Sequence, residues 1–470
     1  MKRVYLCLTV ALCLLLTRVQ AHAEEKLTPR YIIEAIEVTG NKKTKSDVIL
    51  RALQVRAGMA LSVDDPRFVL SRYRVLSLGF FSDVRLRLRR GSRRGRVVLV
   101  VEVTERGTIV LTGLFFGTSE ATVAWGGLGI AERNFLGRGI GLEGAFVLGS
   151  DAAVERGTVQ QGYSLTITAP RFGERRWEFR ASFLFLDGNE FFRKSGLEES
   201  SDPADFLSIR YRRIGVSVWG GFDLGRYTRM SLGFRAEAIE SDVPAAAARR
   251  NPDGGTEPID FGILRGESQL SMLSLRFTRD TRSDPVTPES GGLLNIGLDA
   301  STSLLGSSYD YVKVQVGYKH FIALRWGHII APHVAGGVVF GEAPFFEKFF
   351  IGDFNDLVPS RVMGLNFSTL PSRDVFGTSI DSKRYEEIAF RLGTEYIIPW
   401  FRGGKFFYSG DFFVNVGVIF LTSKEELRLR DRPLFQSIPL DLTVNAGLRL
   451  DTRIGVFHLS IGNALGRIPF

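Results

Sequence analysis

Cysteine is almost absent from this 470-residue chain, which contains two, Cys7 and Cys13. Both lie in an apolar run over residues 4–16, which follows a basic start and precedes a small-residue cleavage site at 21–23. This pattern predicts a secretory signal over residues 1–23 that is removed on export. The exported protein then has no cysteine, which excludes disulfides and thiolate metal sites.

Long apolar runs are also absent after this signal, since none approaches the roughly 20 residues that a transmembrane helix needs. The chain is nevertheless rich in apolar side chains, with 44% hydrophobic residues and 37 phenylalanines. A chain that is this apolar and yet has no helical span is typical of a transmembrane β-barrel.

Excess charge and histidine are scarce too. The formal net charge is +9, and residues 1–23 hold three bases and no acid, which leaves 9 − 3 = +6 for the rest. This mild excess gives no reason to expect nucleic-acid binding. His328 and His333 would point to opposite faces of a strand and cannot share a metal ion. We interpret His458 and Ser460 as packing inside the barrel rather than as a lipase pair, and expect no enzyme, metal site or cofactor.

After a linker at residues 24–30, residues 31–105 predict a small α/β domain. Hydrophobic periodicity gives the order strand, helix, helix, strand, strand. The expected elements cover residues 32–39, 44–53, 62–78, 80–88 and 96–103.

Arginine is concentrated in the hairpin formed by the last two of these strands. The residues are Arg85, Arg87, Arg89, Arg90, Arg93, Arg94 and Arg96. Because the first three alternate with Val84, Leu86 and Leu88, the charges would lie on the outer face of the sheet. Two interpretations remain open: a solvated hairpin tip, or a docking patch for anionic lipid or an acidic client protein.

Residues 106–470 predict a transmembrane antiparallel β-barrel. Segments of about ten alternating residues are separated by Gly, Pro, Asp and Asn turns. In Tyr311–His320, for example, the apolar residues would face lipid, and Lys313 and Lys319 the lumen. The 470 − 108 = 362 residues that follow residue 108 predict about 16 strands at roughly 23 residues per strand and connection. Fifteen segments can be counted, and a strand hidden in Asp260–Thr281 would supply the sixteenth.

Several motifs resemble a known family. Ile36–Asn41 and Leu78–Val84 resemble a POTRA domain, the polypeptide-transport-associated module. Asn134–Gly139, Thr278–Pro285 and Gly447–Arg449 resemble barrel motifs of the outer-membrane assembly factor superfamily, the BamA and TamA type with its two-partner secretion relatives. The resemblance covers essentially the whole exported chain.

This resemblance implies a location in the bacterial outer membrane with the POTRA domain in the periplasm. It implies a monomeric barrel that helps insert or translocate unfolded or nascent outer-membrane client proteins, with possible periplasmic accessory subunits. Two alternatives stay open: a two-partner-type secretion pore for one dedicated exoprotein, and a passive outer-membrane channel.

The non-alternating segment Pro344–Asn366 interrupts the barrel pattern and predicts a long loop folded back into the barrel. The resemblance implies that an arginine of this loop locks it inside the lumen. By position this arginine is Arg361, with Gly352 in the segment before it and Gly364 after it. The alternative is that Arg361 lies in an exposed loop.

The same resemblance implies that acids on the two following strands bind the loop arginine. Glu395 matches the first of these positions, and Asn415 stands where the second acid is expected. A guanidinium in a partly dry lumen needs a carboxylate, for which a bidentate pair is the best geometry.

Glycines predict a weak seam where the first barrel strand, near 108–116, meets the last, 456–461. Gly113 and Gly117 lie in or next to the first, and Gly462 follows the last. Glycine destabilises strand pairing, so this seam could open laterally, while the POTRA sheet edge receives an extended client by strand addition.

Overall fold

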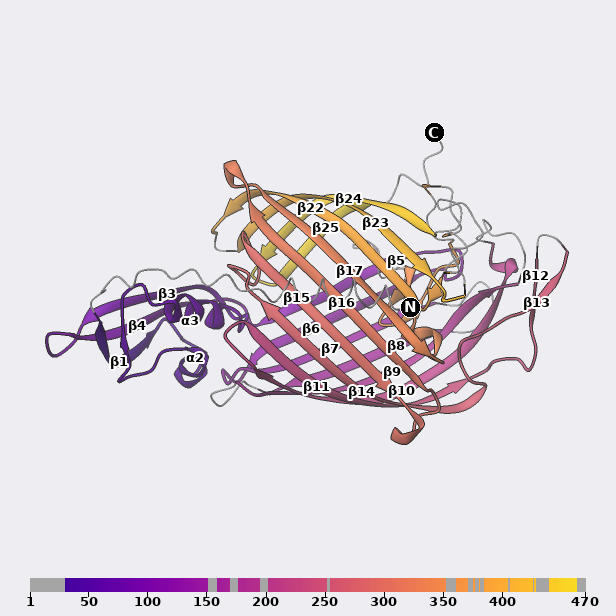
Figure 1. The fold of residues 1–470 in the computed structure, drawn as a ribbon, viewed down its shortest axis with the longest axis horizontal. Coiled ribbons are helices and arrows are strands. Elements are labelled where there is room, and N and C mark those ends of the chain that lie inside the picture. The colour runs from indigo at the N-terminus through magenta and orange to yellow at the C-terminus, as the bar shows by residue number, and fades with distance from the viewer. Residues whose placement is uncertain are drawn as a thin grey trace, which may run out of the picture.

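The computed structural model describes residues 30–150, 159–169, 176–194, 202–251, 254–351, 361–370, 375–376, 380, 384–404, 406–425, 427 and 439–462. Figure 1 shows an α/β domain at one end of a large barrel of strongly tilted strands. The predicted fold class, mainly β with a small α/β domain first, is confirmed.

The α/β domain consists of a four-stranded sheet and two helices. Its elements are β1 (Tyr31–Thr39), α2 (Ser46–Ala52), β2 (Ala60–Leu61), α3 (Pro66–Leu76), β3 (Phe81–Arg90) and β4 (Arg96–Glu105). The strand order is β2-β1-β4-β3, in which β1 runs parallel to β4 and β3 antiparallel to it. Ile49, Val75 and Leu99 are fully buried in the core of this domain. The predicted order of elements is present, and the short strand β2 is added to it.

Both helices begin later than the periodicity predicts. Helix α3 begins at Pro66 because Asp65 caps it and accepts the Arg67 N–H at 2.9 Å. Thr44 lies before α2 and makes a tertiary contact, since its hydroxyl accepts the Asn134 side-chain amide at 2.9 Å.

The barrel is one antiparallel sheet in which each strand pairs with its neighbour along the chain. Its strands are β5 (Ile109–Gly117), β6 (Trp125–Phe135), β7 (Ile140–Gly149), β8 (Gln160–Thr168), β9 (Glu178–Arg193), β10 (Phe206–Asp223), β11 (Thr228–Ser241), β14 (Gly266–Asp280), β15 (Gly291–Ser301), β16 (Tyr311–Ala323), β17 (Ile329–Gly341), β22 (Ile388–Arg402), β23 (Phe407–Thr422), β24 (Leu440–Thr452) and β25 (Gly455–Gly462).

The described residues therefore form 15 barrel strands, one fewer than the sixteen expected and equal to the number of segments counted in the sequence. The segment Asp260–Thr281 holds one barrel strand, β14, and no hidden second strand. With an odd number of antiparallel strands, β5 and β25 run in the same direction.

Alternation divides the barrel wall into an outward and an inward face. On β16, Val312, Val316 and Tyr318 are exposed on the outside. Lys313 and Lys319 point inward and contact Glu347 and Glu395. The faces predicted for this strand are confirmed.

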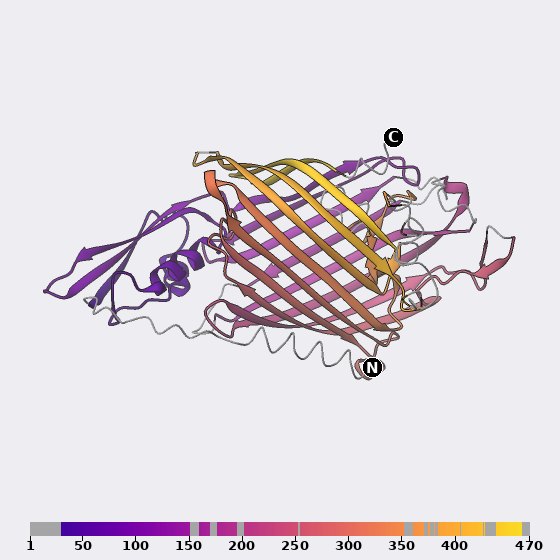
Figure 2. The ribbon, with the colours of Figure 1, turned by 45° about the horizontal axis from the view of Figure 1, so that its top comes forward.

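Figure 2 shows the α/β domain at one end of the barrel and longer connections at the other, including the hairpin of β12 (Ala248–Arg250) and β13 (Thr256–Pro258). None of the helices in the described part of the chain has the length and apolar character to cross a membrane.

The α/β domain is joined to the near end of the barrel by specific polar contacts. The Tyr73 hydroxyl donates to Asp280 at 2.6 Å, and Arg74 pairs with Asp223 at 3.1 Å. The Lys45 N–H donates to the Gly137 carbonyl at 2.9 Å. The barrel motifs around Asn134 and Asp280 thus lie in turns that face this domain.

Candidate functional site

The long connection between β17 and β22 folds into the barrel. Its described elements are η4 (Phe345–Glu347), β18 (Phe349–Phe350), β19 (Arg361–Val362), β20 (Leu365–Asn366) and β21 (Tyr385–Glu386). We call residues 342–387 the luminal loop. Phe345, Leu365 and Phe367 are at most 2% exposed and belong to one apolar cluster with inward residues of the barrel strands.

The first part of the luminal loop packs on β10. The Phe345 ring meets the Tyr211 ring edge-on at 5.2 Å, and the Arg213 guanidinium lies 3.7 Å above the Phe346 ring. The Phe345 N–H also donates to the Gly262 carbonyl at 2.6 Å, which ties the loop to the connection before β14.

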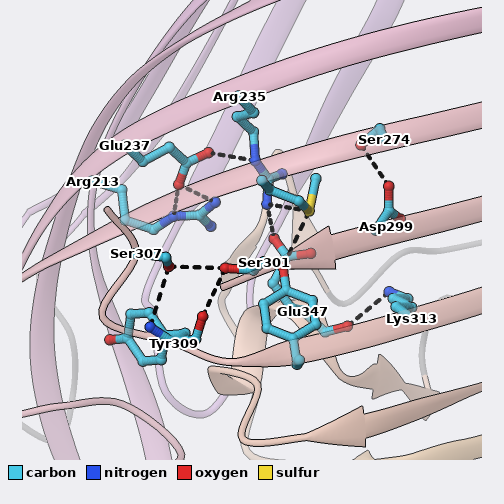
Figure 3. A network of polar contacts seen from close by, with 12 residues as sticks. Arg213, Arg235, Glu237, Ser274, Asp299, Ser301, Ser307, Tyr309, Lys313 and Glu347 are labelled. Atoms are coloured by element: carbon cyan, nitrogen blue, oxygen red, sulfur yellow. Dashed lines mark hydrogen bonds and ion pairs between the residues drawn. The ribbon is translucent and has the colours of Figure 1, made fainter. Parts of the chain in front are cut away.

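Charged side chains surround Glu347 in the same region (Figure 3). Its carboxylate accepts a hydrogen bond from Arg235, and its main-chain carbonyl accepts one from Lys313 at 2.7 Å. Arg235 also lies 3.3 Å from Glu237, whose other oxygen accepts two bonds from Arg213 at 2.7 and 2.9 Å. A loop acid is therefore connected to bases on β10, β11 and β16.

The second part of the luminal loop, β19–β20, packs on β8 and β9. Leu365 lies so close to Gly188 that a Cβ there would be 2.2 Å from the leucine side chain. The Asn366 amide donates to Glu190 at 2.9 Å, and the Tyr211 hydroxyl donates to the Gly364 carbonyl at 3.1 Å. Gly364 has φ of +90°, a conformation that glycine adopts without strain and that this turn requires.

Glu395 points into the lumen from β22 and is 3% exposed. It is bound by two cations of the barrel wall: Lys319 from β16, and Arg449 from β24 at 2.8 Å. Asn415 lies directly opposite Glu395 on β23 and is also buried. The acid predicted for the lock is thus already neutralised within the wall.

Arg361 has its backbone paired with Asn366 in the β19–β20 hairpin. This hairpin contacts β9, which is seven strands from β22 in the sheet order, so it lies against another part of the wall than Glu395. The Arg361 side chain and Gly352 lie outside the described residues. The pair of Arg361 with Glu395 stays a prediction.

The seam glycines lie on the two edge strands of the sheet, with Gly113 and Gly117 in β5 and Gly462 at the end of β25. In the described part, a backbone bond runs from the Leu111 N–H of β5 to the carbonyl of Ile454, in the turn just before β25, at 2.8 Å.

An ion pair lies beside this bond at the end of the barrel that faces the α/β domain. Arg106 donates to Asp451 at 2.9 Å, and their side chains are 7% and 10% exposed. Both contacts join the start of β5 to the β24–β25 hairpin at this end of the barrel.

The three arginines predicted to dock lipid or an acidic client are exposed on β3, an edge strand of the α/β sheet. Arg85, Arg87 and Arg89 have side chains that are 65%, 60% and 59% exposed. Each has an acid within 3.3 Å, on Asp83, Glu102 and Glu37 respectively. The patch is partly neutralised, and the hairpin tip adds four more arginines.

The sequence analysis missed the residues around Glu347 and those at the domain junction. Lys313 was recognised as inward, but the partners of an inward residue depend on how the loop enters the lumen. In the described ranges, no group of three or more His, Cys, Asp or Glu side chains is arranged to hold a metal ion.

Comparison with known families matches both parts of the chain. The model described as "Omp85 superfamily domain" matches residues 134–468, and the POTRA model, "Surface antigen variable number repeat", matches residues 31–106. These matches support the family resemblance that the motifs indicated.

Individual proteins are similar to this chain in sequence or in fold. The outer membrane protein assembly factor BamA of Nitratidesulfovibrio vulgaris is 24% identical over 347 residues, which cover 73% of this chain and 39% of that protein. CdiB from Escherichia coli has a similar fold, with a TM-score of 0.56 and 12% identity over 92% of this chain and 72% of the other. BamA from Haemophilus ducreyi lacking POTRA domains 1–3 gives a TM-score of 0.48 and 17% identity, over 92% and 81%. The chain is a member of the Omp85 superfamily.

Proposed function

We propose that this protein lies in the bacterial outer membrane, with its POTRA domain in the periplasm, and helps insert or translocate client proteins. The observation that supports the proposal is the place of β5 and β25 at the two edges of the barrel sheet, where we propose a weak seam. The backbone bond and the ion pair described above join the start of β5 to the β24–β25 hairpin at one end of the barrel. A sheet edge exposes backbone donors and acceptors that can pair with another chain.

Two features favour opening of this seam. Strands β5 and β25 run in the same direction, and parallel pairs are slightly less stable than antiparallel ones. Gly113 and Gly117 add no side-chain packing to β5. The Arg106–Asp451 pair would hold the periplasmic end closed until a client arrives.

The POTRA domain provides the surface for the client. Strand β3 is an edge of its sheet, and Arg85, Arg87 and Arg89 face solvent beside that edge. Figures 1 and 2 both show the β3–β4 hairpin pointing away from the barrel. Because this hairpin lies far from the bilayer around the barrel, an acidic extended segment of a client fits better than lipid of that membrane.

Proteomics of the outer membrane after depletion of the protein tests this proposal. Broad loss of barrel proteins is the expected result. Loss of a single exoprotein from the medium would instead indicate a dedicated secretion pore, and an unchanged proteome would indicate a passive channel. In a second strain, Arg85, Arg87 and Arg89 are replaced by Gln, with Arg212→Gln on the barrel as the control. Client loss in the triple variant alone supports docking at β3.

A further inference from the structure

The barrel wall beside the luminal loop carries more base than acid. Arg213, Arg235 and Lys313 come from β10, β11 and β16, and Glu237 is the wall acid that pairs with both arginines. Arg213 and Glu237 are 5% and 2% exposed, so water can do little to solvate these charges. Asp299 lies opposite Lys313 on β15 and pairs with Arg276 at 2.8 Å, so without the loop four bases of the wall would face two acids.

Glu347 of the luminal loop supplies the missing acid. It is 8% exposed, and its carboxylate pairs with Arg235. Its carbonyl accepts the Lys313 ammonium at 2.7 Å, so one loop residue satisfies bases on two strands. With the loop in place, four bases face three acids.

Aromatic residues on either side of Glu347 complete the contact with the same bases. The Arg213 guanidinium lies 3.7 Å from the Phe346 ring centre, and the Lys313 ammonium 4.7 Å from that of Phe349. Cation–π contacts are strongest where water is excluded. The segment 345–349 therefore matches the bases of the wall with both an acid and two rings.

We propose that Glu347 is the residue that anchors the luminal loop in the barrel, through Arg235 and Lys313. The polarity is the reverse of the predicted lock, because the acid is on the loop and the bases are on the wall. Glu395, the acid of the predicted lock, binds Lys319 and Arg449 and does not need the loop for neutralisation. Glu347 is a positioning residue, and its role does not depend on the proposed function.

The accessibility of the start of the luminal loop to a labelling reagent tests this inference in whole cells. Ala343 is 5% exposed and adjoins the anchored segment, so Ala343→Cys places a small, buried thiol there. The parent chain, whose cysteines lie in the predicted signal, gives the background for labelling with a charged maleimide. We expect Glu347→Gln to speed labelling at least about tenfold, because it removes the loop carboxylate that pairs with the partly buried Arg235.

Three variants sharpen the experiment. Glu342→Gln, an exposed acid on the same loop, is the matched control and should leave labelling unchanged. The double variant Glu347→Arg with Arg235→Glu exchanges the two charges and should restore protection of the thiol from labelling. If Glu347→Gln acted only by disturbing packing, this exchange would not restore protection. If Glu347→Gln does not yield an assembled barrel, labelling of Lys313→Met combined with Ala343→Cys tests the proposal instead. Unchanged protection of the thiol introduced by Ala343→Cys, in an assembled Glu347→Gln or Lys313→Met barrel, would overturn the proposal.

Discussion

The hydroxyl of Tyr73, on POTRA helix α3, donates to the Asp280 carboxylate at the end of barrel strand β14, at 2.6 Å. Asp280 is also held by Arg282 at 2.9 Å, so its position is fixed from the barrel side. Burial, followed by the bond to Asp280, raises the pKa of Tyr73, which keeps its proton available as a donor. This contact links two residues that are 207 positions apart.

Replacing Tyr73 by Phe removes this hydrogen bond and leaves the ring in place. We expect the junction to weaken by about 1–2 kcal/mol, since the partner left behind is partly buried. Hydrogen exchange in α3, followed by mass spectrometry, should become faster while exchange in the barrel strands is unchanged. Tyr163→Phe, on the exposed outer face of β8, is the control. Equal exchange in both variants would mean that the hydroxyl contributes nothing to docking.

Gly137 provides a second test of the junction. Its φ is +70°, and a Cβ there would lie 2.1 Å from the Lys43 carbonyl oxygen of the POTRA domain. Gly137→Ala must therefore push the POTRA domain away or strain the turn, at about 1–3 kcal/mol. Gly144→Ala on β7 meets nothing within 4 Å and is the matched control. Limited proteolysis should cut the POTRA domain from the barrel faster in the first variant, and not in the second.

The alternation of side chains predicted much of this fold because a barrel strand has two unlike faces. The inward position of Lys313 followed from this alone, whereas Glu395 was singled out by the resemblance to the family. Their partners did not, since register, strand number and the path of the luminal loop decide which inward residues meet. Glu347 lies in a segment without alternation, so nothing local marked it as an anchor.

A long-range contact also explains why α2 begins later than predicted. Thr44 is a favourable helix cap in sequence, but its hydroxyl binds Asn134, 90 residues away, and α2 begins at Ser46. The motif around Asn134 could be recognised from its resemblance to the family. Its physical role, a turn that receives the POTRA domain, needed the structure.

Glu105 should make the POTRA domain sensitive to acid. Burial alone would raise the pKa of its carboxyl, but the N–H groups of Thr44 and Lys43 outweigh burial and lower it. A lowered pKa stabilises the folded state fully above the unfolded value of about 4.3, and this contribution is lost as the pH falls through the folded pKa.

We expect Glu105→Gln to speed hydrogen exchange around Thr44 at pH 7. The difference from the parent should shrink below about pH 4, where the parent carboxyl is protonated as well. Glu102→Gln, on the exposed face of β4, is the control. A difference between Glu105→Gln and the parent that stays constant down to about pH 3 would show that the charge is not responsible.

Double-mutant cycles can decide which cation Glu395 needs. Glu395→Gln leaves Lys319 and Arg449 without their acid, and we expect the barrel to lose about 3–5 kcal/mol of stability. In a cycle with Arg449→Met, the coupling free energy should be about 1–3 kcal/mol, because the two groups are in direct contact at 2.8 Å. Urea unfolding in lipid vesicles, followed by tryptophan fluorescence, gives these values.

The same measurement tests the predicted luminal lock. A cycle of Arg361→Met with Glu395→Gln should give coupling near zero if the wall cations satisfy Glu395, and coupling like that of Arg449 if Arg361 also binds it. Arg402→Met is the control, since Arg402 lies on β22 with Glu395 but pairs with Asp411 at 2.7 Å. Coupling to Arg361 alone would restore the family-type lock and leave Glu347 as a second anchor. Coupling to Arg449 alone would mean that Glu395 stabilises the wall, so that the luminal loop must be held elsewhere.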